Sequence, residues 1–97
     1  MKMLITYDIS TRKPSGRKRL SKIAKCCENF GLRVQYSIFE CDVDPALWEE
    51  FKHKLLGIYE PDEDSLRFYH LGSNWKGKVE HYGSKKIVDP IGDTLLF

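Results

Sequence analysis

The sequence predicts one α+β domain in which two helices cover one face of an antiparallel sheet. Strand-like and helix-like segments follow the order strand, helix, strand or hairpin, helix, strand, which is the split βαβ arrangement. The 97 residues, 41% of them hydrophobic, are enough for one core and too few for two, so residues 1–97 are expected to form a single domain. A domain of this size buries only a little over ~60% of its unfolded surface, which favours a homodimer as a source of further burial.

The first strand is expected over residues 2 to 9. Both of its faces are largely apolar as far as Asp8, which is typical of a central strand covered on both sides. A loop is expected over residues 10 to 16, because it contains a proline, a serine and a glycine in succession. Apolar residues at helical spacing then predict the first helix over roughly residues 17 to 30, ended by Gly31.

The middle of the chain predicts strand structure followed by a second helix. Residues 32 to 43 are rich in β-branched and aromatic side chains, which predict strand structure. The segment could be one bent strand or two short strands with a turn near Gln35 to Ser37. Asp44 and Pro45 form a helix start, an acidic N-cap followed by proline at the first helical position. The apolar stripe that follows predicts a helix over residues 45 to 59.

The last third predicts a strand over residues 65 to 71, a turn over 72 to 74 and a weaker strand over 79 to 82. The chain then ends in an apolar run from Thr94 to Phe97, which would be unfavourable in water. We expect this run to dock, either within the chain or across a dimer.

Charge is distributed unevenly although the formal net charge is only +2. The segment from Arg12 to Arg33 holds eight basic residues and one acid, whereas Glu40 to Asp64 holds nine acids and two lysines. Such a dipolar domain can present a basic face to nucleic-acid phosphates. Two solvated helix faces of opposite sign would give the same composition, so charge alone leaves both interpretations open.

Other patterns exclude several classes of protein. The three cysteines, Cys26, Cys27 and Cys41, suit neither a disulfide framework nor a zinc site, and buried structural thiols are expected. The three histidines have no metal-ligand spacing, and no nucleophilic triad can be argued. No apolar run approaches the ~18 residues of a membrane span, and the opening residues are apolar too briefly for a signal peptide. A cytoplasmic protein that does not enter membranes is expected.

Asp8 is the best-placed chemical group, at the carboxyl end of the first strand. In a purely structural role, Asp8 would cap the Ser10 to Gly16 loop or pair with Arg17 or Arg19. One carboxylate makes a poor magnesium site alone, but a two-fold axis would bring a second copy of it. Such a pair could hold one ion that activates water for phosphodiester hydrolysis.

Basic and aromatic residues elsewhere allow two interpretations each. The segment Arg17 to Arg19 at the start of the first helix is either ordinary surface charge or a phosphate-binding neighbour of Asp8. Arg33, Gln35, Ser37 and Phe39 alternate on one side of a strand, which is typical of a solvent-facing side or of a polar interface. The aromatic rings favour core packing, because the RRM signature is absent.

Four segments together resemble the CRISPR-associated Cas-two family. They are Leu4 to Ile9, Arg17 to Leu20, Gly31 to Glu40 and Asp64 to Gly72. They span nearly the whole chain, in order and at the usual spacing. The resemblance implies a ferredoxin-like homodimer, with the C-terminal strand completing the partner's sheet. The loop from Thr11 to Gly16 departs from the commonest pattern of the family in length and charge.

The resemblance also implies a site and partners. Asp8 of both subunits would bind Mg²⁺ or Mn²⁺ as the catalytic ligand. Tyr7, Arg17, Arg19, Arg33 and Phe39 would support activity or contact substrate, and no organic cofactor is implied. The implied activity is metal-dependent cleavage of single-stranded RNA or double-stranded DNA, with a place beside the CRISPR integrase in spacer acquisition. A non-catalytic DNA-binding scaffold is the alternative, and a regulatory ferredoxin-like module that binds a small effector is a third hypothesis.

Overall fold

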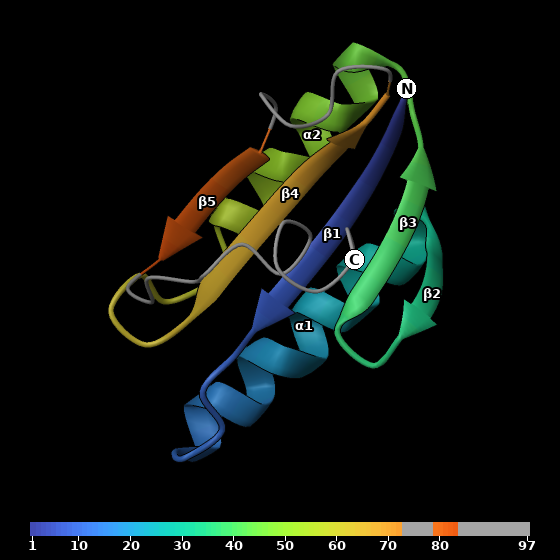
Figure 1. The fold of residues 1–97 in the computed structure, drawn as a ribbon. Coiled ribbons are helices and arrows are strands. Elements are labelled where there is room, and N and C mark those ends of the chain that lie inside the picture. Colours follow the sequence, from blue (N-terminus) through green and yellow to red (C-terminus); the bar gives the residue numbers. More distant parts are fainter. Residues whose placement is uncertain (73–78, 84–97) are drawn as a thin grey trace, which may run out of the picture.

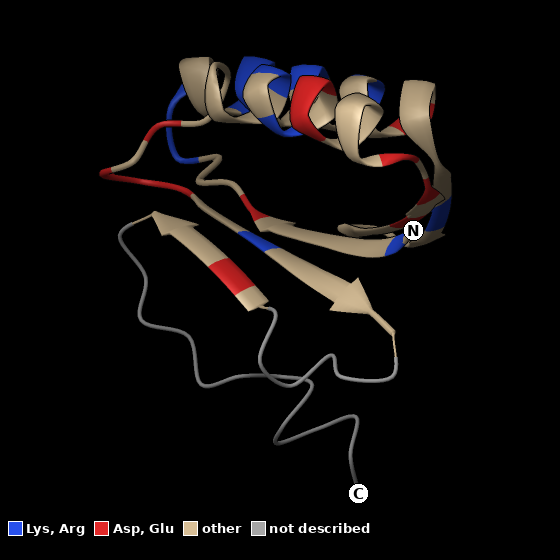
Figure 2. Ribbon diagram, turned by 90° about the horizontal axis from the view of Figure 1, so that it is seen from above, with Lys and Arg blue, Asp and Glu red and all other residues tan. Residues whose placement is uncertain are grey.

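The protein is described here by a computed structural model, which describes residues 1–72 and 79–83. Seven elements follow in chain order: β1 (Lys2–Asp8), α1 (Pro14–Phe30), β2 (Leu32–Gln35), β3 (Ile38–Asp42), α2 (Pro45–Leu56), β4 (Ser65–Leu71) and β5 (Val79–Gly83). The strands form one sheet in the order β2-β3-β1-β4-β5, and every neighbouring pair is antiparallel. Both helices pack on the same face of this sheet (Figures 1 and 2). The predicted α+β class is confirmed.

The core lies between the sheet and the two helices. Successive side chains of a strand point to opposite faces, so Met3, Ile5 and Tyr7 of β1 are buried toward the helices. Trp48 of α2 packs its edge against Phe68 of β4, with the ring centroids 5.0 Å apart. No helix in the described ranges is long and apolar enough to cross a membrane.

The three cysteines are buried, as the sequence predicts for structural thiols. Burial raises the pKa of the Cys41 thiol to about 11 and raises the pKa of Cys27 as well. A nucleophilic role needs the thiolate, so these side chains act as small apolar groups.

Both helices begin or end at residues that the sequence prediction placed wrongly. Helix α1 begins at Pro14 rather than at residue 17, because proline at the first helical position has its φ already fixed near the helical value. Helix α2 ends at Leu56 rather than at residue 59, and the Gly57 N–H bonds back to the His53 carbonyl. Its predicted N-cap is confirmed, since the Leu47 N–H donates to Asp44 Oδ1 over 2.7 Å.

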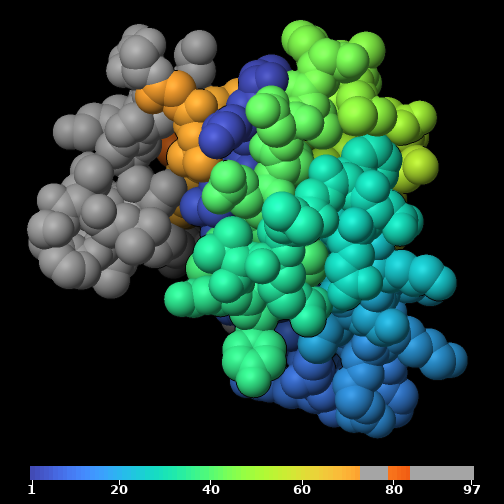
Figure 3. Space-filling view, turned by 90° about the vertical axis from the view of Figure 1, so that its right-hand side faces the viewer, coloured from blue at the N-terminus to red at the C-terminus, as the bar shows by residue number. Residues whose placement is uncertain are grey.

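Residues 32 to 42 form two strands, so the hairpin alternative is the correct one. The turn falls at Tyr36 and Ser37, within the predicted range. Figure 3 looks onto this edge of the molecule, where Leu32 is 79% exposed and Tyr36 is 90% exposed. The weaker strand is confirmed as β5, whereas the run from Thr94 to Phe97 lies outside the described residues.

Candidate functional site at the end of strand β1

Asp8 is the last residue of β1, and its side chain is exposed. It lies opposite Ser65, the first residue of β4, which in turn lies opposite Gly83, the last residue of β5. The end of β1, the start of β4 and the end of β5 thus lie side by side at this edge of the sheet. Strand alternation directs Tyr7 into the helix-covered core, so Asp8 belongs to the other face of the sheet.

A second carboxylate, Asp64, lies immediately before β4 and is fully buried. The Ser10 N–H donates to its Oδ1 over 2.9 Å, and the Glu60 N–H donates to its Oδ2 over 2.8 Å. Arg19 donates through Nε over 2.7 Å and through Nη2 over 3.3 Å. Burial alone would raise the pKa of Asp64, but Arg19 and the two amides outweigh it and hold the pKa below its ordinary value.

Asp64 performs the structural task that the sequence analysis considered for Asp8. It caps the loop after β1 through Ser10, and it is the partner of Arg19. In the sequence, Asp64 stands in the acidic segment Glu40 to Asp64 and in the family-like segment Asp64 to Gly72, and no structural role was predicted for it. The available signal was its place directly before the buried segment Ser65 to Tyr69, where an acid requires partners.

The start of α1 lies against the loop that follows Asp8. A Cβ atom at Gly16 would overlap the Ser10 carbonyl, so the two backbones are in close contact. Four basic side chains of this region are exposed, namely Arg12, Lys13, Arg17 and Lys18. Lys13 pairs with Glu63 over 3.4 Å. The contact places the basic first turn of α1 against the loop that follows Asp8 (Figure 2).

Tyr7, Arg33 and Phe39 form a separate cluster on the helix-covered side of the sheet. The rings of Tyr7 and Phe39 are stacked with centroids 6.2 Å apart, and the Arg33 guanidinium lies 5.0 Å from the Phe39 centroid. The Tyr7 hydroxyl donates to the Tyr36 carbonyl over 3.1 Å, and burial raises its pKa. These contacts hold the β2–β3 hairpin against the core. Any effect of these three residues on activity would therefore act through the position of the hairpin.

The described residues of one chain contain no group of three or more histidine, cysteine or acidic side chains that could hold a metal. Asp8 is therefore a single carboxylate at an exposed strand end. Magnesium accepts such a site only when waters, substrate phosphates or a second carboxylate complete its oxygen shell.

The fold and the site define a ferredoxin-like α+β domain with an exposed acid at the end of its first strand and basic side chains beside it. The family model described as "CRISPR associated protein Cas2" matches residues 1–79, and the chain belongs to this family.

Known proteins match most or all of the length of this chain. A Chlorobaculum tepidum protein described as "CRISPR-associated endoribonuclease Cas2" is 55% identical over 96 residues, which cover 99% of this chain and all of its own. A Halalkalibacterium halodurans protein described as "CRISPR-associated endonuclease Cas2" is 48% identical over the full length of both chains. The crystal structure of Streptococcus pyogenes Cas2 at pH 6.5 matches with a TM-score of 0.70 at 51% identity, covering 86% of this chain and all of its own.

Proposed function

We propose that the chain is a metal-dependent endonuclease of CRISPR defence and that Asp8 is its metal ligand. The observation that carries the proposal is the position of Asp8, exposed at the end of β1, while Asp64 supplies the loop cap and the arginine partner. The names of the relatives support nuclease chemistry, since one is called an endoribonuclease and another an endonuclease. The two names leave the choice between RNA and DNA open.

The metal site needs a second chain. An isologous homodimer brings the same patch of both subunits together, so two Asp8 carboxylates could share one Mg²⁺ or Mn²⁺. A divalent ion held there would supply Lewis-acid stabilisation and a water of lowered pKa. Arg17, which is exposed in the first turn of α1, would bind the phosphate of the substrate. Arg19 would act through Asp64, by holding the loop after Asp8 in place.

A second candidate function is a non-catalytic DNA-binding subunit that works with the CRISPR integrase in spacer acquisition. The exposed basic side chains around the start of α1 favour it, because phosphate binding needs no catalytic carboxylate. The two functions share the homodimer and the basic surface, and they differ in whether Asp8 is required.

The Asp8→Asn variant separates the two functions. We expect cleavage of single-stranded RNA or duplex DNA in Mg²⁺ to fall by about 100-fold or more, because the amide is a weak ligand for a hard cation. Dimerisation and duplex binding should remain. The matched control is Asp42→Asn, which removes an exposed strand-end carboxylate on β3.

Each outcome of this experiment has a clear meaning. Cleavage by Asp8→Asn at the wild-type rate would contradict the catalytic proposal. If highly purified wild type and variant both fail to cleave but both support spacer integration, the scaffold function is correct.

A further inference from the structure

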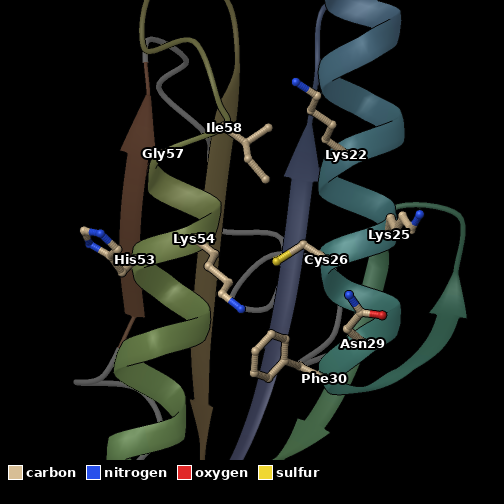
Figure 4. A pocket seen from close by; sticks show the side chains of 9 residues that line it. All are labelled: Lys22, Lys25, Cys26, Asn29, Phe30, His53, Lys54, Gly57 and Ile58. Atoms are coloured by element: carbon tan, nitrogen blue, oxygen red, sulfur yellow. The ribbon is translucent and has the colours of Figure 1, made fainter.

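A groove of about 520 Å³ lies between helices α1 and α2, on the helical side of the sheet. Its lining includes Cys26 and Phe30 of α1 and Ile58, which follows α2. Figure 4 shows Cys26, Phe30 and Ile58 in the space between the helices, with Lys22 and Lys54 extending over it from opposite sides. The groove therefore has an apolar floor and basic walls. Its volume is in the range of sites that bind ligands or side chains.

The positive charge of the groove is not neutralised locally. Within the described ranges, no carboxylate forms an ion pair with Lys22, Lys25 or Lys54. Lys54 Nζ instead lies 5.4 Å from the centroid of the Phe30 ring. His53 also lines the groove. A ligand that brings negative charge would find these lysines available.

The apolar floor distinguishes a protein ligand from nucleic acid. A phosphate backbone would use the lysines but would gain nothing from Cys26 and Ile58. A peptide side chain can fill such a floor, while flanking carboxylates meet the lysines.

We propose that this groove binds an acidic segment of a partner protein, in which an aliphatic or aromatic anchor is flanked by Asp or Glu. The anchor would sit on Phe30 and Ile58, and the carboxylates would pair with Lys22 and Lys54. The site is separate from Asp8, which lies on the other face of the sheet. One subunit could therefore bind this segment and nucleic acid at the same time.

The test uses two short synthetic peptides, an acidic one with a central leucine and the same peptide with serine in place of leucine. Fluorescence anisotropy should show about tenfold tighter binding of the leucine peptide to the wild-type protein. The Lys22→Gln/Lys54→Gln double variant should lose about tenfold in affinity for that peptide. The matched control, Arg12→Gln/Lys18→Gln, removes the same charge outside the groove and should bind like wild type. Amide shifts of Cys26, Phe30 and Ile58 should change on binding.

Three results would overturn the proposal. The two peptides could bind equally, or the double variant could bind as tightly as its control. The lysine pair could also be required for duplex DNA binding while neither peptide binds, which would assign the groove to nucleic acid. Every readout is a binding measurement, so the outcome does not depend on whether Asp8 is catalytic. Circular dichroism and thermal unfolding of each variant confirm that it is folded.

Discussion

The Asp64 carboxylate joins three segments that are distant along the chain. It holds Ser10 in the loop after β1, Arg19 in helix α1, and Glu60 in the turn after α2. All three segments surround the strand end that carries Asp8. The position of Asp8 therefore depends on a neighbouring acid that would take no part in the proposed chemistry.

The first prediction at the residue scale concerns Asp64→Asn. The asparagine keeps the shape of the side chain but removes the buried and closer of the two carboxylates that pair with Arg19, so we expect a loss of about 2–4 kcal/mol of unfolding free energy. Urea denaturation measures this loss. The Glu63→Gln control removes the half-exposed partner of Arg19 and should cost less than about 1 kcal/mol.

The same residue predicts a pH dependence. The pKa of Asp64 is lowered in the folded protein, so its contribution is present above the ordinary aspartate pKa and is lost as the pH falls through the lower folded pKa. The stability difference between wild type and Asp64→Asn should therefore shrink in acid, below the ordinary range of aspartate. A difference that stays constant across this range would contradict the assigned role of Asp64.

Sequence patterns predict the direction of side chains well and their distant partners poorly. Alternation along β1 was enough to place Tyr7 and Asp8 on opposite faces of the sheet. The partners of Arg19 were not predictable, because Asp64 lies 45 residues away and meets it only after the sheet has formed. The assignment of Asp8 as a metal ligand stays a prediction.

At the scale of elements, the start of α1 shows why a local pattern was misleading. The run Pro14, Ser15, Gly16 indicates a loop on propensity, yet these residues form the first turn of the helix. Glycine is needed there because Ser10 lies directly against its Cα. A tertiary contact thus explains a residue that local propensity disfavours.

A third prediction follows from this contact. In Gly16→Ala the new methyl group would overlap the Ser10 carbonyl, so backbone must move and we expect a loss of about 1–3 kcal/mol of unfolding free energy. The matched control is Gly72→Ala, since no atom of the described residues lies within 4 Å of a Cβ at that position. Thermal denaturation of the pair measures the difference. Equal melting temperatures would show that the contact carries no energetic constraint.

At the scale of the whole molecule, the order of the elements was sufficient to predict the arrangement of sheet and helices. Each helix follows a strand and buries an apolar stripe, and only one sheet face receives them (Figure 1). The groove between the helices was not predictable, because its shape depends on the distance and angle at which α1 and α2 pack on the sheet. The homodimer also stays a prediction, since it concerns a second chain.

The last prediction tests whether catalysis belongs to the dimer. If two Asp8 carboxylates share one ion, a dimer that contains a single Asp8→Asn subunit should be inactive. After subunit exchange in an equal mixture of wild type and variant, activity should then fall to about one quarter, the fraction of dimers with two intact subunits. Independent sites would instead retain about one half. Light scattering should first give twice the chain mass of 11.3 kDa for both proteins. A stable monomer that cleaves nucleic acid, or a linear dependence on the wild-type fraction, would exclude the shared site.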